Sequence, residues 1–410
     1  MRPATPRLRA VLLTAAGAGL VWGPAAPAVA ASDSWKVPSE ASITVRGHGF
    51  GHGHGMSQHG AEGAARRGLS AAQILDFYYP GTTAGKRGGR VSVLISADTT
   101  DDLVVRSRDG LRVRDLASGA TTRLPKKIGG RTPALWRLRQ NHRDRTRVSW
   151  RTSAGGQGSW TKWRDLKGNG ELSAGNAPVT LVTPSGDRAY RGRLRALPPS
   201  AGSKARDTVN KLRLDDYLRG VVPLEIPASW SPAAVRAQAV AARSYAVFER
   251  RTPRAAHYQL CDTSSCQVYG GVRAEQPGSD AAVRATAKQV RLADGQAAFT
   301  QFSSSSGGWT AAGSRPYLRA KADPYDDWAG NAHHDWSVTL TDARLESAFP
   351  AVGDLRSIKV LDRDGNGQWG GRVRSVRLAG ARGAVTVSGD ALRFGLGLKS
   401  PWVTFRVRSR

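Results

Sequence analysis

The sequence predicts an α+β protein in which a mixed helix/strand body carries an inserted β-rich module. The residues that follow Pro232 contain no helix breaker until about Arg250, which predicts one long helix. Short β-branched runs between residues 90 and 197, separated by Gly-containing turns, predict the β-rich module. The 410 residues, 40% of them hydrophobic, suffice for one large domain or two to three smaller ones.

Residues 1–30 have the composition of an export signal. Three arginines precede an apolar run from Ala10 to Trp22, and Ala28–Ala30 offers a small-x-small cleavage site. The run is too short and too broken by Gly and Pro for a membrane span, so an uncleaved anchor is the weaker alternative. We therefore expect a secreted protein that acts outside the cell membrane, with no stable membrane span after cleavage.

The chain is strongly basic. Its formal net charge is +29, and removing the three arginines of the leader leaves +26. A surplus of this size attracts polyanions. In an exported chain we expect anionic wall polymers and no nucleic acid, because no nucleic-acid-binding motif is present. A coding bias toward Arg would contribute to the same surplus.

A Gly/His-rich element follows a short polar leader at residues 31–40. Gly and His alternate from Gly47 to Gly55, and in a strand this period places His48, His52 and His54 on one face. Three imidazoles on one face can ligate zinc, but no carboxylate or Cys nearby completes the ligand set. We favour a polymer cleft in which the glycines admit the polymer and the histidines donate or accept hydrogen bonds.

The remaining elements follow from caps, breakers and short apolar runs. Ser70 predicts a helix N-cap and Pro80 the stop of that helix, while Ser279 predicts the cap of a helix from Asp280 to about Arg291. The segment from Arg139 to Gly175 lacks periodicity and predicts a mobile insertion. Strands are expected at 91–95, 103–105, 111–113, 179–182, 298–302, 358–361, 373–378, 384–387 and 402–407.

Glu225 is the leading candidate for a catalytic group. It lies between apolar residues, with Pro223 and Pro227 on either side, so we expect a rigid, extended connector. Apolar surroundings raise a carboxyl pKa, which allows a proton to be held near neutral pH and delivered to a leaving group. Ser231-Pro232 then predicts the start of the long helix. A Glu that only caps or pairs near that helix is an even alternative.

Three other motifs admit two interpretations each. Cys261 and Cys266, the only cysteines, predict a disulfide in an exported chain, and His257 makes a zinc site the rival. The Asp362–Gly367 segment begins like a calcium loop but lacks the closing Glu, so a tight turn between strands is favoured. His333, His334 and Asp335 are expected in a surface loop.

Two segments resemble the signature of the SpoIID/LytB family, the sporulation stage II protein D and amidase-enhancer group. They are Asp216-Tyr-Leu-Arg-Gly-Val-Val-Pro-Leu-Glu-Ile-Pro227 and Ala237-Gln-Ala-Val-Ala-Ala-Arg-Ser-Tyr245. The resemblance implies peptidoglycan binding and, for the sporulation member, lytic transglycosylase activity. It places the catalytic Glu of the family on Glu225, and some family members are thought to carry metal around the cysteine loop.

The resemblance also implies a circular permutation. Family chains normally end with an element like Gly51-His-Gly-His-Gly-Met-Ser-Gln58 and Tyr78-Tyr-Pro-Gly-Thr82, which here opens the chain. We therefore expect residues 31–85 to complete a catalytic domain at 206–410, with the β-rich module at 86–205 inserted between them. His52, Ser57 and Gln58 are then expected to contact substrate.

Ser303-Ser-Ser-Ser-Gly-Gly-Trp-Thr310 resembles a further family loop that lines the glycan cleft, although Ser303 replaces the His of that pattern. No Gly-x-Ser-x-Gly elbow accompanies this run, so it does not predict a serine nucleophile. Arg243 could stabilise developing charge or hold a substrate carboxylate. Further substrate contacts are expected from Tyr245, Gln267, Tyr269, Ser305 and Ser306.

The favoured function is cleavage of peptidoglycan glycan strands by lytic transglycosylation, with no required cofactor. Hydrolytic glycosidases usually need two carboxylates, whereas the motif offers one that is well enclosed; Asp215 and Asp216 keep a hydrolase open. A non-catalytic wall-binding enhancer of an N-acetylmuramoyl-L-alanine amidase is the main alternative. A structural wall protein held by charge is the third.

Overall fold

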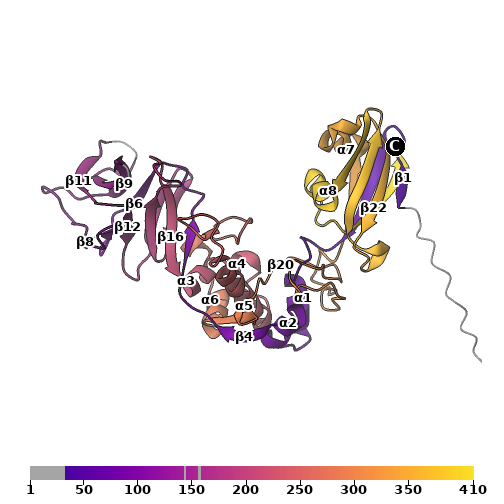
Figure 1. The fold of residues 1–410 in the computed structure, drawn as a ribbon, viewed down its shortest axis with the longest axis horizontal. Coiled ribbons are helices and arrows are strands. Elements are labelled where there is room, and N and C mark those ends of the chain that lie inside the picture. The colour runs from indigo at the N-terminus through magenta and orange to yellow at the C-terminus, as the bar shows by residue number, and fades with distance from the viewer. Residues whose placement is uncertain (1–32, 143–144, 156–157) are drawn as a thin grey trace, which may run out of the picture.

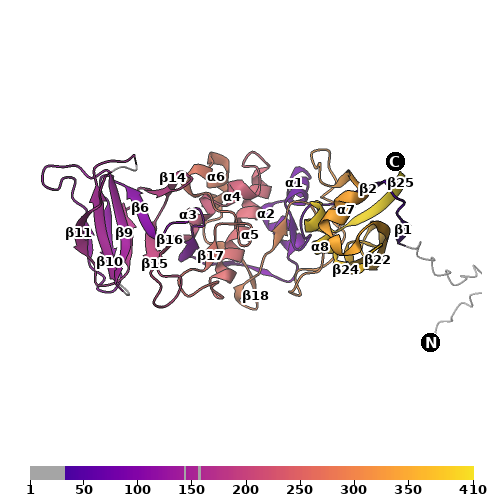
Figure 2. The ribbon, with the colours of Figure 1, turned by 90° about the horizontal axis from the view of Figure 1, so that it is seen from above.

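The computed structural model describes residues 33–142, 145–155 and 158–410, so the predicted export signal lies outside the described residues. Three bodies follow one another along an elongated molecule: β-sheets at one end, helices in the centre and further sheets at the other end (Figures 1 and 2). This arrangement confirms the predicted α+β class. None of the helices in the described ranges is both long and apolar enough to span a bilayer.

The β-rich module packs a six-stranded sheet against a seven-stranded sheet. Buried and part-exposed residues alternate in Asp102–Arg106 and Val179–Thr183, as expected when one face of a strand enters a core. One sheet contains β11 (Thr161–Asp165), β10 (Arg145–Arg151), β9 (Leu135–His142), β6 (Asp102–Arg106), β13 (Val179–Thr183) and β14 (Gly186–Tyr190). The other contains β17 (Leu260–Cys261), β5 (Arg90–Leu94), β16 (Asp207–Arg213), β15 (Arg193–Leu197), β12 (Gly170–Ser173), β7 (Arg112–Asp115) and β8 (Thr121–Arg123).

The prediction of a mobile insertion at residues 139–175 is wrong. The segment carries part or all of four strands, β9 to β12, which pair within the two sheets. Its many arginines and tryptophans hide the strand period, because Arg stems and aromatic rings cover the outer face. Arg164, for example, lies 3.8 Å from the ring centre of Trp163.

The central body is built around the long helix α5 (Pro232–Glu249). Pro232 occupies the first turn, where its missing N–H is no loss, and alanines let neighbouring helices approach closely. Its helices are α1 (Gln58–Arg66), α2 (Ala71–Tyr78), α3 (Leu214–Arg219), α4 (Val222–Glu225), α5 and α6 (Pro277–Ala285), with a 3₁₀ turn at Gly271–Ala274. Short sheets β19 (Gln296–Ala297)–β18 (Gln289–Ala293)–β4 (Thr83–Lys86) and β20 (Phe302–Ser303)–β3 (Met56–Ser57) join them.

Two of the predicted helix starts are confirmed and one is wrong. Ser70 caps α2 in a capping box with Gln73. Ser231 is the N-cap of α5, although its own amide and hydroxyl bond the buried carboxylate of Glu62. Ser279 is not a cap, because Pro277 already starts α6, and the residues expected to continue that helix form β18 instead. The run expected to be a strand at 298–302 is mostly irregular, reaching a strand only at Phe302.

The far end of the molecule holds two smaller sheets with their own core. One sheet is β1 (Ser34–Lys36)–β22 (Leu355–Arg363)–β23 (Val373–Gly380)–β24 (Gly383–Ser388), and the other is β21 (Asp335–Thr341)–β2 (Ala41–His48)–β25 (Val403–Ser409). Helices α7 (Asp342–Ala348) and α8 (Gly389–Leu396) and 3₁₀ turns at Pro350–Val352 and Gln368–Gly370 complete it. The Asp362–Gly367 segment does lie between two strands, but the favoured tight turn is wrong, because Asp362 and Arg363 still pair in β22 and the connection to β23 runs over residues 364–372.

The N-terminal segment belongs to two bodies. The supposed polar leader contains β1, and β2 pairs with β25, so the start of the described chain lies beside its end. Residues 56–79 instead pack on α5 in the central body. The expected catalytic domain at 206–410 is thus divided, because residues 335–410 share a separate core with residues 35–45. The circular permutation itself stays a prediction.

Candidate active site

Glu225 lies at the end of a short helix, so the expected extended connector is wrong. Pro223 fits the first turn of α4, where proline is tolerated, and α4 stops because Pro227 forces Ile226 into an extended conformation (φ −137°, ψ 154°). Glu225 itself is half-buried. Burial raises the pKa of its carboxyl to about 7, from an ordinary value of 4.5. A group with this pKa exchanges a proton readily near neutral pH.

Two donors from distant parts of the chain reach this carboxylate. One is the side-chain amide of Gln58, the first residue of α1, and the other is the backbone N–H of Val268. Both bonds favour the charged form and so oppose the effect of burial. Gln58 therefore lies beside Glu225 and joins the opening segment of the chain to the candidate catalytic group, while its predicted contact with substrate stays a prediction.

The pKa of Glu225 predicts a pH-dependent cost to stability. Because the folded-state pKa lies above the ordinary value, the folded protein binds the proton more tightly than the unfolded chain. As the pH rises from about 4.5 to about 7, the folded protein therefore loses free energy of unfolding relative to a variant with a neutral side chain at this position. This loss amounts to roughly 3 kcal/mol.

Glu225→Gln is expected to raise the melting temperature at pH 8 but not at pH 4, as calorimetry at both values would show. An equal shift at both would contradict the raised pKa.

A second prediction concerns the donor Gln58. Removing the amide in Gln58→Ala takes away a bond to the charged carboxylate, so the pKa of Glu225 should rise further above about 7. A ¹³C NMR titration of the Glu225 carboxyl measures this without any substrate. Gln73→Ala is the matched control, because Gln73 bonds Ser70 at the surface of α2. A titration unchanged by Gln58→Ala would exclude the bond.

A buried network holds α1 in place. The carboxylate of Asp326 accepts hydrogen bonds from Ser57 Oγ (2.5 Å), Ser305 Oγ (2.7 Å), Asn331 Nδ2 (3.0 Å) and the Ser306 and Gly307 amides (3.0 and 2.9 Å). His334 Nδ1 lies 3.1 Å away. Burial acts to raise the pKa of Asp326, but hydrogen bonds led by those from His334 and Ser57 outweigh it and lower the pKa. Burial and the nearby Asp326 carboxylate raise the pKa of Asp323 to about 7.

This network changes the interpretation of several predicted contacts. Ser57 caps α1 and bonds Asp326, while Ser305 and Ser306 are buried against Asp326 and Asp323. The three hydroxyl groups bond to these buried carboxylates, so the serines position the loop and do not face a substrate. His334 belongs to the same network, and it lies in a loop as predicted but is only part-exposed, whereas Asp335 already begins β21. No spacing in the sequence indicates that Asp326 gathers these donors.

The predicted contacts on and near α5 also lie in the interior. Arg243 is fully buried, and its Nε bonds Asp215 at 2.9 Å. Gln267 donates to the Ala242 carbonyl oxygen, and Tyr269 donates to Asn210 Oδ1. Tyr245 is nearly buried, with its ring 5.4 Å from that of Phe299. These four side chains support the helix that follows Glu225 and do not reach out to hold a polymer.

The two acids kept for a hydrolase are paired as well. Asp215 is bound to Arg243, and Asp216 is bound to Arg213 at 2.8 Å. The pKa of Glu225 is shifted by burial and by hydrogen bonds from Gln58 and the Val268 amide, and by no carboxylate of the described residues. Glu225 therefore has no second carboxylate beside it, in the described chain, with which to share the reaction.

The cysteine loop supports the second donor. Cys261 and Cys266 form a disulfide with Cα atoms 5.5 Å apart, two residues before Val268. His257 points elsewhere, with Nε2 2.6 Å from Asp207 Oδ2. Nowhere in the described ranges do three or more His, Cys, Asp or Glu side chains gather as a metal would require. The disulfide therefore stiffens the loop whose amide contacts Glu225.

The histidines of the Gly/His element do not share a strand face. Gly49, Gly51, Gly53 and Gly55 all have left-handed φ values, from 68° to 107°, which an extended strand does not allow. His48 ends β2 with Nδ1 2.6 Å from Asp335. His52 and His54 stack on each other beside Arg372, where burial lowers the pKa of His52 to about 3. The predicted contact of His52 with substrate at Glu225 is therefore not supported.

A row of part-exposed rings next to Gln58 was not predicted from the sequence. It consists of Trp230, Trp328, His59, His333 and Phe50, which we call the aromatic row. His59 follows Gln58 in α1, and its ring centre lies 4.9 Å from that of Trp230 and 5.2 Å from that of His333. The ring of His333 lies 5.0 Å from Phe50, which is 37% exposed. These residues come from separate segments, so no local pattern connects them.

Comparison with known proteins finds similarity in the part of the chain that contains Glu225. Residues 202–292 match the family model described as stage II sporulation protein. The amidase enhancer of Bacillus subtilis (strain 168) is 37% identical over 136 residues, which cover 32% of this chain and 18% of the relative. Stage II sporulation protein D of the same strain is 48% identical over 48 residues, covering 12% and 14%.

An uncharacterised protein of Brachyspira hyodysenteriae is 34% identical over 103 residues, covering 25% of this chain and 28% of the relative. The chain thus spans less than a third of the length of each of these relatives. The segment matched by the family model contains α4, α5 and the cysteine loop, and hence both Glu225 and its donor Val268. The similarity to the SpoIID/LytB family thus lies in residues 202–292, the segment that holds the candidate acid.

Proposed function

We propose that this protein acts on the bacterial cell wall and cleaves the glycan strands of peptidoglycan by lytic transglycosylation. The observation that supports this best is the single half-buried carboxyl of Glu225, whose pKa is raised to about 7. One group can then serve first as acid and later as base. A hydrolase would need a second carboxylate to activate water or to attack the sugar.

The proposed reaction uses only this carboxyl and the substrate. Protonated Glu225 donates its proton to the glycosidic oxygen, and the bond from that oxygen to C1 breaks. The C6 hydroxyl oxygen of the same sugar then bonds to C1, and the Glu225 carboxylate takes the hydroxyl proton. The product is a 1,6-anhydro end, no water is consumed, and Glu225 is again protonated.

The surroundings of Glu225 suit a long carbohydrate. Aromatic faces pack against the C–H faces of sugars, and the aromatic row extends from Trp230, five residues after Glu225, to Phe50. The net charge of +26 without the leader favours adhesion to anionic wall polymers. Action outside the cell membrane, as the export signal predicts, belongs to the same proposal.

A second candidate is a non-catalytic wall-binding protein that enhances a separate cell-wall amidase. It is favoured by the 37% identity to a protein named amidase enhancer. Incubating purified wall with this protein and identifying the muropeptides by mass spectrometry separates the candidates. Anhydro ends support the enzyme. Unchanged muropeptides, with wall binding that resists moderate salt, favour the enhancer, whereas binding abolished by moderate salt indicates attachment by charge.

A further inference from the structure

A second pocket lies at the opposite end of α5 from Glu225. It has a volume of about 680 Å³ and is lined by the end of α5, the turn before β19 and the loop around residue 317. Pro232, where α5 starts, and Phe248, in this pocket, are 16 residues apart, which places the pocket roughly 24 Å along the helix. No residue of the aromatic row or of the Glu225 site lines it.

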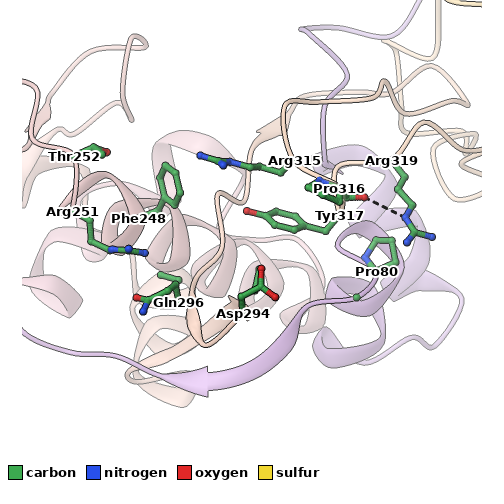
Figure 3. Close-up of a pocket in the computed structure, with 13 residues that line it drawn as sticks. Pro80, Phe248, Arg251, Thr252, Asp294, Gln296, Arg315, Pro316, Tyr317 and Arg319 are labelled. Atoms are coloured by element: carbon green, nitrogen blue, oxygen red, sulfur yellow. Dashed lines mark hydrogen bonds between the residues drawn. The ribbon is translucent and has the colours of Figure 1, made fainter.

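Two aromatic rings form facing walls of this pocket. Figure 3 shows Phe248 and Tyr317 on opposite sides of the gap. The Tyr317 hydroxyl accepts a hydrogen bond from the Phe299 amide at 2.7 Å, and Phe299 in turn contacts the Phe248 ring at 4.8 Å. Both rings are therefore held in place before any ligand arrives, and they suit an aliphatic or C–H-rich group between them.

Cationic groups stand at the rim. Arg251 and Arg315 extend toward the gap between the rings, whereas Arg319 turns away and donates to the Pro316 carbonyl oxygen (Figure 3). The Arg315 guanidinium lies 5.3 Å from the ring centre of Phe248. Within the described chain, neither Arg251 nor Arg315 forms an ion pair with a carboxylate. Their guanidinium groups are donors only, so they are available to an anion.

One acid in the lining determines what kind of anion fits. Asp294 lies below the rings and is the single carboxylate among the lining residues. It would repel a polymer that carries a phosphate at every repeat. It would accept a hydrogen bond from an amine or amide N–H placed next to the bound anion. The pocket therefore offers donors for a carboxylate, an acceptor for an N–H and apolar walls between them.

From this arrangement we propose that the pocket binds a short peptide with a free carboxylate and a free amine. Arg251 and Arg315 take the carboxylate, Asp294 takes the amine, and the Phe248 and Tyr317 rings hold an aliphatic side chain. Stem peptides of peptidoglycan have this chemistry, and this last assignment alone rests on the proposed function. Such a pocket would hold a stem peptide while a glycan strand lies elsewhere on the protein.

Isothermal titration with a synthetic stem tetrapeptide tests the proposal. The peptide carries a free C-terminal carboxylate and one free side-chain amine, and the titration uses the full chain with Glu225→Gln so that no turnover occurs. We expect saturable binding that weakens about tenfold to hundredfold when the carboxylate is amidated or when Arg251 and Arg315 are both replaced by Ala. Arg319→Ala is the matched control and should bind as the parent does.

Several results would overturn the proposal. They are absence of saturable binding, equal affinity for the amidated peptide, or an affinity that the double Arg variant leaves unchanged. Poly(glycerol phosphate) binding that is stronger than peptide binding and is lost in the same variant would instead assign the pocket to a phosphate polymer. Because the titration measures binding without catalysis, its result does not depend on whether the protein cleaves glycan strands. If the double Arg variant and Arg319→Ala melt at the same temperature by circular dichroism, the loss of binding in the double variant is not due to unfolding.

Discussion

Glu225→Gln is expected to abolish the formation of 1,6-anhydro ends from purified wall. Glutamine keeps the shape and its carbonyl oxygen can still accept the Val268 N–H, but its amide has no acidic proton to transfer and cannot act as a base. Loss of a positioned acid or base costs about 10²- to 10⁴-fold in rate. The measurement is the initial rate of anhydro-muropeptide release, determined by mass spectrometry. In the parent protein the rate should also fall as pH rises above about 7, where Glu225 loses its proton.

Asp216→Asn is the matched control for this experiment. Asp216 is another carboxylate in the segment matched by the family model, but it is bound to Arg213. Its replacement should leave the rate of anhydro-end release almost unchanged. Full activity in Glu225→Gln would exclude the proposed acid. Loss of activity in Asp216→Asn, with ordinary reducing ends as product, would indicate a two-carboxylate hydrolase instead.

Asp326→Ala is expected to release the opening segment of the chain from the central body. The substitution leaves several buried donors without an acceptor, including the Ser306 and Gly307 amides. Breaking such a buried charged group costs about 3–5 kcal/mol. The bond from Ser57 to Asp326 is lost at the same time, so Gln58 should no longer be held against Glu225, and cleavage of wall should fall with it.

Hydrogen exchange measures this effect locally, which suits a chain whose described residues form three separate hydrophobic cores. We expect the amides of Gly60, Ser306 and Gly307 to exchange faster in Asp326→Ala, while those of β22 and β23 stay protected. The neighbouring, exposed Asp327 provides the control, since Asp327→Ala removes an acid of the same segment from the surface. Unchanged protection of Gly307 in Asp326→Ala would show that the network does not hold the segment.

Local chemistry already predicts much of this fold. Ser70 with Gln73, and Ser231 with Pro232, mark helix starts that the structure confirms, and the runs at 91–95, 103–105 and 179–182 become strands. One prediction from proline is wrong: Pro223 and Pro227 predict an extended connector, but Pro223 lies in the first turn of a helix, where proline is tolerated. The candidate acid, Glu225, could be found from its apolar neighbours, because burial of a carboxyl depends largely on the residues beside it.

What the sequence by itself determined is thus many of the local elements and the position of one carboxyl with apolar neighbours, whereas the choice between a disulfide and a zinc site at Cys261 and Cys266 needed the structure. The tertiary structure alone decided which polar side chains reach that carboxyl. The sequence suggests Arg243 and Ser305 as substrate contacts, but in the structure they bond to Asp215 and Asp326. Gln58 reaches Glu225 from 167 positions earlier in the chain. Helix and strand signals act over a few residues, whereas hydrogen-bond partners are set by packing between segments far apart, which no local period records.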